Sequence, residues 1–129
     1  RWIPQEMYYY AVEKTDFKPN PVRTEGTYTK YASLDDKIDG FFYYSAYMKY
    51  GYGRAMQESV SEVRHGHITK DEGKALIEKF DGEYPRKYED EFYDYISMEK
   101  NEFIELCDKF RPDHLWEKKS NKWVLKKLL

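Results

Sequence analysis

The sequence predicts a mainly α fold of about five short helices, with an extended, turn-rich segment before them and a short arm or strand after them. Apolar residues recur at helical spacing from residue 33 onward, and glycine or proline follows most of these stretches. Before that point, Pro4, Pro19 and Pro21 interrupt the chain. We therefore predict a connector over residues 1–32 and a C-terminal helical domain over residues 33–129.

The connector shows no sustained helical period, and it allows at most one short helix around residues 5–12. The first helix of the domain is expected to begin at Ser33, which has the type and place of an N-cap, with Asp35 and Asp36 in its first turn. Gly51 should end this helix. Its predicted inner face consists of Ile38, Phe41, Phe42, Ser45 and Met48.

Two further helices are marked by their ends. Residues 54–65 should form the second helix, which Gly66 stops; its predicted inner face consists of Met56, Val60 and Val63. Thr69 and Glu72 have the spacing of a capping box and should open the third helix, which Gly82 closes. The apolar residues of that third helix are Leu76, Ile77 and Phe80.

The last part of the chain predicts two more helices and a tail. Residues 85–96 should form the fourth helix, with an inner side of Tyr88, Phe92, Tyr95 and Ile96. Ser97 should cap the fifth helix, which Pro112 ends, and its inner face consists of Phe103, Leu106, Cys107 and Phe110. The tail holds Trp116 and Trp123 around a polar turn, so we expect a short strand or an arm docked by its tryptophan.

Composition excludes some classes of function. The net charge of −2 argues against a nucleic-acid binder and against a charged membrane surface, and no apolar run reaches the roughly 20 residues of a membrane span. The single Cys107 excludes an internal disulfide and fits a reducing cytoplasm. The 14 Tyr and 3 Trp suit half-buried grooves and interfaces, so we expect a module that packs against another part of a protein.

Two groups of polar residues could take part in chemistry. Asp35, Asp36 and Asp39 offer oxygen ligands for Mg²⁺ or for sugar hydroxyls, although acids are also common as caps in the first turn of a helix. The glycines of residues 51–53 permit close backbone approach, and Arg54 after them could bind phosphate or carboxylate. An ordinary turn between two helices is the alternative interpretation.

Other kinds of site are not indicated by the sequence. His65 and His67 have no third ligand nearby in the sequence, so we expect a solvated turn and no metal site. Neither a nucleophile–histidine–acid arrangement nor a glycine-rich phosphate loop is present. The catalytic residues are therefore left unassigned.

The order of residues carries more information than their spacing. Residues 23–40 (RTEGTYTKYASLDDKIDG) and 49–55 (KYGYGRA) resemble the C-terminal part of the N-acetyl sugar amidotransferases, which belong to the N-type ATP pyrophosphatase superfamily. The resemblance extends over nearly the whole chain, through residues 1–8, Arg64, Gly66, residues 68–73, 80–82, 110–112 and 114–116.

This resemblance implies an activity for the parent enzyme. ATP would adenylate the carbonyl oxygen of a sugar N-acetyl group, and ammonia would then displace AMP to leave an acetamidino group. Such sugars occur in bacterial surface polysaccharides, in the O-antigen of lipopolysaccharide or as nonulosonic acids. ATP and Mg²⁺ would bind to an N-terminal ATP pyrophosphatase domain, because the phosphate loop of that domain is absent from this chain. We expect the chain alone to bind no cofactor and to be inactive.

The resemblance also implies partners and a site. The partners would be the N-terminal domain, glutaminase subunits that deliver ammonia, and a nucleotide-linked sugar. The chain would complete the acceptor site or brace the catalytic domain. Seven residues are predicted to face the nucleotide-linked sugar, with Lys and Arg on phosphate or carboxylate and Tyr and Asp on hydroxyls: Glu25, Tyr28, Lys30, Asp36, Asp39, Lys49 and Arg54.

A competing hypothesis is a helical module for protein–protein interaction that binds no small molecule. It predicts an exposed apolar patch made of four tyrosine rings, Tyr43, Tyr44, Tyr47 and Tyr50.

Overall fold

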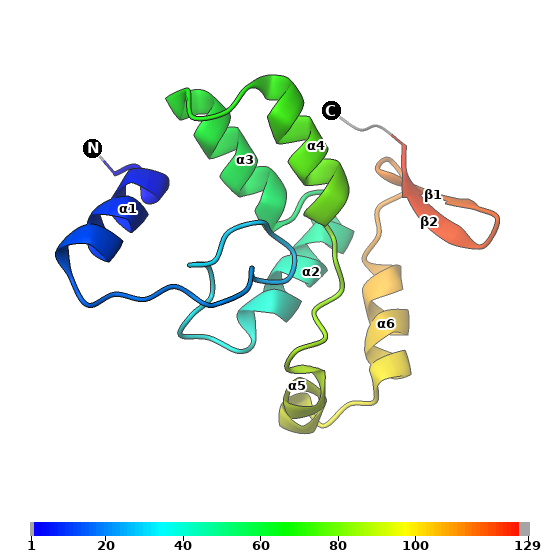
Figure 1. Ribbon diagram of the computed structural model, residues 1–129. Helices are drawn as coiled ribbons and strands as arrows, with labels where there is room; N and C mark the ends of the chain where they lie inside the picture. Colours follow the sequence, from blue (N-terminus) through cyan, green and yellow to red (C-terminus); the bar gives the residue numbers. More distant parts are fainter. Residues whose placement is uncertain (1, 127–129) are drawn as a thin grey trace.

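The computed structural model describes residues 2–126, which form six helices and one small antiparallel sheet (Figure 1). The elements are α1 (Pro4–Lys14), α2 (Asp39–Tyr50), α3 (Arg54–His65), α4 (Lys70–Phe80), α5 (Glu89–Ile96), α6 (Lys100–Lys109), β1 (Trp116–Lys119) and β2 (Lys122–Leu125). Helices account for 51% of the chain. The predicted mainly α class is confirmed.

The short helix allowed around residues 5–12 is present as α1, which is three residues longer and has proline in its first turn. Helix α2 begins at Asp39, six residues later than predicted, and Ser33 is no N-cap because its φ of 53° is left-handed. Tertiary contacts explain this difference: Thr24 Oγ1 donates to Ala32 O (2.7 Å), and Ser33 Oγ donates to Asp39. These bonds hold the residues before α2 in a loop.

Most other helix ends agree with the sequence. Gly51 and Gly66 end α2 and α3 with φ of 77° and 78°, and Thr69 and Glu72 form the predicted capping box. Ser97 was predicted wrongly, because it ends α5 in a left-handed conformation and Glu99 is the N-cap of α6. The residues before Glu89 form a turn, so α5 begins later than expected.

The core lies where α2, α5 and α6 meet. It consists of Phe41, Met48, Phe92, Phe103 and Cys107, and the rings of Phe41 and Phe92 stack with centroids 3.7 Å apart. Several residues predicted to face inward are exposed instead: Phe42, Val60, Tyr95, Leu106 and Phe110. Each short helix buries only a narrow stripe, so the wider apolar faces read from the sequence are only partly covered.

The tail forms a hairpin in which β1 and β2 pair antiparallel, with Trp116 opposite Leu125. Trp116 is buried, and its Nε1 donates to Met48 O (2.8 Å), which ties the hairpin to the end of α2. Arg111 lies over the Trp116 ring at 4.3 Å. Of the two alternatives for the tail, the short strand is present, as β2 of the hairpin. Across residues 2–126, every helix is too short or too polar to span a bilayer.

Candidate functional site

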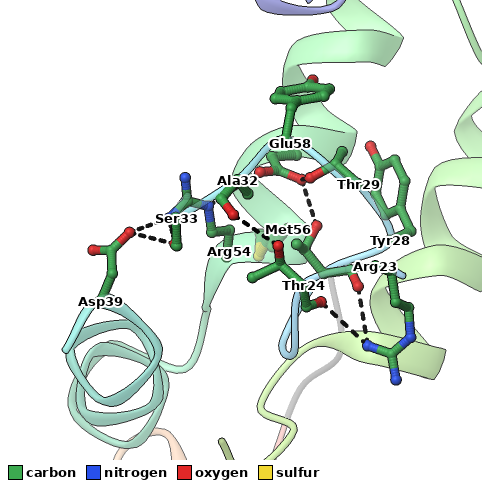
Figure 2. Close-up of polar contacts among 12 residues, drawn as sticks. Arg23, Thr24, Tyr28, Thr29, Ala32, Ser33, Asp39, Arg54, Met56 and Glu58 are labelled. Atoms are coloured by element: carbon green, nitrogen blue, oxygen red, sulfur yellow. Dashed lines mark hydrogen bonds and ion pairs between the residues drawn. The ribbon is translucent and has the colours of Figure 1, made fainter. Parts of the chain in front are cut away.

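The 23–33 loop, which comprises residues 23–33 between α1 and α2, lies along one face of α3 (Figure 2). That face presents Arg54, Glu58 and Glu62, which are four residues apart and therefore lie one above another on the helix. The block of sequence that gave the strongest resemblance is thus folded back onto the helix that follows it.

Glu58 is the main acceptor on this face. Its carboxylate accepts hydrogen bonds from Thr27 Oγ1, from Thr29 Oγ1 (3.1 Å) and from Arg54 Nε (3.1 Å). One turn further on, Tyr28 OH donates to Glu62 Oε1 (2.8 Å). Burial raises the pKa of Tyr28, so this phenol remains protonated and keeps donating. Three consecutive residues of the loop are therefore fastened to α3.

Arg54 is surrounded by acceptors. Its Nη1 donates to Asp39 Oδ2 (2.6 Å) and to Ser33 Oγ (2.8 Å), and its guanidinium lies over the Tyr43 ring at 4.4 Å. Burial alone would lower the pKa of Arg54, but Tyr43, Asp39 and Glu58 raise it above its usual value. In this arrangement Arg54 links the loop, α2 and α3, and its charge is balanced by two carboxylates.

A second set of contacts holds the start of the loop. Arg23 forms a two-pronged pair with Glu83 (2.6 and 2.8 Å) and lies over the Phe80 ring at 4.6 Å. Gly26 N donates to Glu83 as well (2.8 Å). The hydrogen bonds from Arg23 lower the pKa of Glu83, so this carboxylate stays ionised.

The turn before Arg54 is closed by a residue far away in the sequence. Asp81, at the end of α4, accepts from Gly53 N (2.8 Å) and from Met56 N (3.2 Å), and Ala55 N donates to Gly26 O (3.1 Å). Burial raises the pKa of Asp81, while these N–H groups oppose the rise. Asp81 thus caps α3 from another element, and the amides of this helix N-terminus already have acceptors.

A groove of about 320 Å³ lies between α1 and α3, and we call it the α1–α3 groove. Its groups are carboxylates, amides, a hydroxyl, imidazoles and two tyrosine rings, and they come from Ile3, Pro4, Gln5, Tyr31, Tyr43, Arg54, Gln57, Glu58, Ser61, Glu62, His65 and His67. Tyr31 OH donates to Gln5 Oε1 (2.9 Å) across it. Such a lining offers both hydrogen bonds to hydroxyl groups and aromatic faces for a sugar ring.

A second groove of about 250 Å³, which we call the Tyr88 groove, lies on the other side of the loop. Glu25, Asp36, Lys37 and Lys87 bring charges to it, and Glu25 accepts from Lys87 N (3.0 Å). Ser33 lines this groove, and Arg54 lines the first one. The contact between Ser33 and Arg54 therefore lies between the two grooves.

The seven predicted site residues do not converge on one cleft. Tyr28, Asp39 and Arg54 belong to the network on α3, and of these three only Arg54 lines the α1–α3 groove. Glu25 and Asp36 line the Tyr88 groove, and Asp36 accepts from Ile38 N (2.7 Å) in the turn just before α2.

The two predicted lysines lie apart from both grooves. Lys30 is exposed on the loop, and Lys49 is exposed on α2, where its Nζ lies 5.2 Å from the centroid of the Tyr50 ring.

Sequence reasoning missed four acids that hold the site together: Glu58, Glu62, Asp81 and Glu83. The spacing of four from Arg54 to Glu58 to Glu62 could have identified the first two as members of one helix face. Asp81 and Glu83 gave no local signal, because their partners lie 25 to 60 residues away along the chain.

The four-tyrosine patch of the competing hypothesis is not formed. Tyr43 packs against Arg54, Tyr44 against the core and Tyr47 against Trp116, and only Tyr50 is exposed.

Within residues 2–126, no three side chains of His, Cys, Asp or Glu are placed to hold a metal ion. The turn at residues 51–53 offers no open phosphate cradle, because the N–H groups of Gly53 and Met56 already donate to the Asp81 carboxylate.

Comparison with known protein families gives one match, which covers residues 25–129 and is described as LPS biosynthesis protein WbpG-like, C-terminal domain. The comparison with curated proteins finds no match. The matched range includes the 23–33 loop from Glu25 onward, all of α2 to α6 and the hairpin. The chain therefore belongs to the family of C-terminal domains of WbpG-like lipopolysaccharide biosynthesis proteins.

Proposed function

We propose that this domain binds the sugar acceptor for an ATP-dependent amidotransferase that converts a sugar N-acetyl group to an acetamidino group. The product would enter lipopolysaccharide biosynthesis, in the O-antigen part, and the reaction would take place in the cytoplasm, where ATP is available. In this proposal, ATP, Mg²⁺ and glutaminase-derived ammonia would be handled by other parts of the enzyme.

The lining of the α1–α3 groove is the observation that carries the acceptor role. Gln57, Ser61 and His65 face the groove from successive turns of α3, and Tyr31 and Tyr43 add aromatic rings. Hydroxyl groups of a sugar need donors and acceptors of this kind, and the tyrosine rings offer apolar faces on which a sugar ring can stack.

The network behind the groove has a supporting role in this proposal. Arg54 and Glu58 are already bonded to Asp39, Thr27 and Thr29, so they hold the groove wall in place. This assignment revises the predicted role of Arg54 as a phosphate ligand. Lys30 and Lys49 lie outside the α1–α3 groove, so their predicted contact with the sugar-linked phosphates is a separate hypothesis that the groove does not support.

Kinetics of the full-length enzyme test the proposal. Replacing Gln57 or Ser61 by alanine should raise the KM for the N-acetyl sugar about tenfold, because one lost hydrogen bond to substrate is worth about 1.4 kcal/mol. AMP release that depends on both sugar and ammonium is the readout. Glu78→Ala, an exposed change on α4, is the control and should leave KM unchanged.

A binding experiment tests the groove without turnover. Titration of the ¹⁵N-labelled chain with a nucleotide-linked N-acetyl sugar should shift the amide resonances of α3 around Gln57 and Ser61. KM values within twofold of wild type, together with no shifts along α3, would contradict the acceptor role.

A further inference from the structure

Helix α1 carries apolar and aromatic side chains on several sides. Residues 7–12 read MYYYAV, and six consecutive residues at about 100° each are distributed around the helix axis, next to the charged Glu6, Glu13 and Lys14. Contacts on one side of the helix therefore cannot bury all of these apolar residues. The other helices of the domain lack such an unbroken apolar run except α2, which contributes to the core.

The described residues cover α1 on one side only. Tyr8 stacks on Tyr31 with ring centroids 4.6 Å apart, and Gln5 accepts from the same tyrosine. None of the residues of α1 is buried, and Tyr9 and Tyr10 are each 61% exposed. Trp2, just before the helix, is 74% exposed. Figure 1 shows α1 at one edge of the molecule, on the side opposite the hairpin.

This outer face has the composition of a docking surface. Tyrosine and tryptophan supply most of the binding energy in protein interfaces, and exposed clusters of them mark sites where another protein packs. Trp2, Tyr9 and Tyr10 are three such residues within nine positions of the chain. A second domain that covered them would also bury the parts of α1 that this domain leaves open.

We propose that the outer face of α1, defined by Trp2, Tyr9 and Tyr10, docks the domain that precedes this one in the same polypeptide. Two observations point to that occupant. The family is one of C-terminal domains, and its match begins at residue 25, after α1, so α1 lies between the family domain and whatever precedes it. A covalently attached domain has a millimolar effective concentration, so a few aromatic anchors are enough to hold it.

This docking would place the α1–α3 groove at the boundary between two domains. Ile3, Pro4 and Gln5 line that groove from α1. A sugar bound there would then face the preceding domain, which the proposed function assigns to ATP chemistry. The inference rests on the proposed function for this last step only, because the docking itself needs no substrate.

Hydrogen exchange measured without substrate tests the docking. In the full-length protein, the amides of α1 should exchange at least tenfold more slowly than in the chain of residues 1–129. The double variant Tyr9→Gln/Tyr10→Gln should abolish this difference in the full-length protein. Tyr95→Gln is the matched control, since Tyr95 is also exposed on a helix but lies on α5.

Three results would overturn the docking proposal. Equal exchange of α1 in both proteins would mean that the preceding domain does not cover it. A double variant that kept the full protection would show that the aromatic face is not the contact. Protection in the 1–129 chain that grows with protein concentration would assign the face to a second copy. If the full-length protein showed slow exchange in α1 but did not bind the N-acetyl sugar, only the proposed function would be overturned.

Discussion

Gly82 is the residue at which α4 meets α2. The ring of Tyr47 lies directly over it, and a Cβ added at Gly82 would stand 2.2 Å from Tyr47 Cε1. The φ of Gly82 is also left-handed, at +74°. Backbone conformation and the available space therefore both require glycine at residue 82.

Gly66 offers a matched control for that claim. It has almost the same φ, +78°, with no atom within 4 Å of an added Cβ. Gly66→Ala should cost about 1–2 kcal/mol of unfolding free energy from the backbone alone. Gly82→Ala should cost about 1–3 kcal/mol more, because Tyr47 must move. Urea denaturation of both variants measures the difference, and equal losses would show that Tyr47 yields without cost.

Glu83 makes the stability of the 23–33 loop depend on pH. Hydrogen bonds from Arg23 lower its pKa in the folded protein below the ordinary 4.5. A carboxyl group whose pKa is lower in the folded protein than in the unfolded chain stabilises the fold at every pH above its unfolded pKa. This stabilisation is lost as the pH falls through the folded pKa. The contribution is therefore complete at neutral pH and is lost progressively as the pH falls below 4.5 through the folded pKa.

Comparison of wild type with Glu83→Gln tests this pH dependence. At pH 7 the variant should be less stable by about 1–2 kcal/mol, since the pair is partly exposed. At pH 3 the difference in unfolding free energy should be smaller than at pH 7, because Glu83 becomes protonated as the pH falls through its pKa. Thermal or urea unfolding at both pH values gives the result, and a difference that stays constant with pH would contradict the ion pair's role.

At the scale of elements, the 23–33 loop behaves as part of α3. Its threonine and tyrosine side chains donate to Glu58 and Glu62, and Arg54 joins both to the start of α2. The loop has few apolar contacts of its own, so its position depends on these polar groups. Removal of one carboxylate leaves several donors without a partner, which costs more than the bond itself.

Glu58→Ala should therefore destabilise the domain by about 2–4 kcal/mol. The side chain of Glu58 is only 17% exposed, so water cannot fully replace it. Hydrogen exchange of Ala32 N and its neighbours in the loop should accelerate more than exchange in α6. Glu78→Ala on the exposed side of α4 should change neither quantity. Uniform acceleration across the domain would show that the loop has no local dependence on Glu58.

Helix ends were predictable from the sequence to the extent that local contacts set them. Gly51, Gly66 and the Thr69 capping box act within one turn, so their residues alone identify them. Ser33 misled the prediction because a hydrogen bond to Asp39 replaces its capping role. The candidate site was predictable only as a block of sequence, since Asp81 and Glu83 reach it from another element.

At the scale of the whole molecule, the apolar core is small and mostly aromatic. Phe41, Phe92 and Phe103 join α2, α5 and α6, while polar contacts join the loop to α3 and to Glu83 and hold Asp81 against the start of α3. Which ring of α5 enters the core was not predictable, because Phe92 and Tyr95 both fit a helical apolar stripe and only tertiary packing selects between them.

That selection gives the last prediction. Phe92 stacks on Phe41, so Phe92→Ala removes the ring that connects α5 to α2 and should cost about 3–5 kcal/mol. Tyr95→Ala on the same helix should stay within about 0.5 kcal/mol of wild type, since Tyr95 is 74% exposed. Far-ultraviolet circular dichroism reports all helices, and tryptophan fluorescence reports the environment of Trp116 in the hairpin. Because one core holds both regions, the unfolding midpoints measured by the two signals should fall together in Phe92→Ala. A variant that lost helix signal while the fluorescence transition stayed at its wild-type midpoint would mean that the hairpin and the aromatic core fold independently.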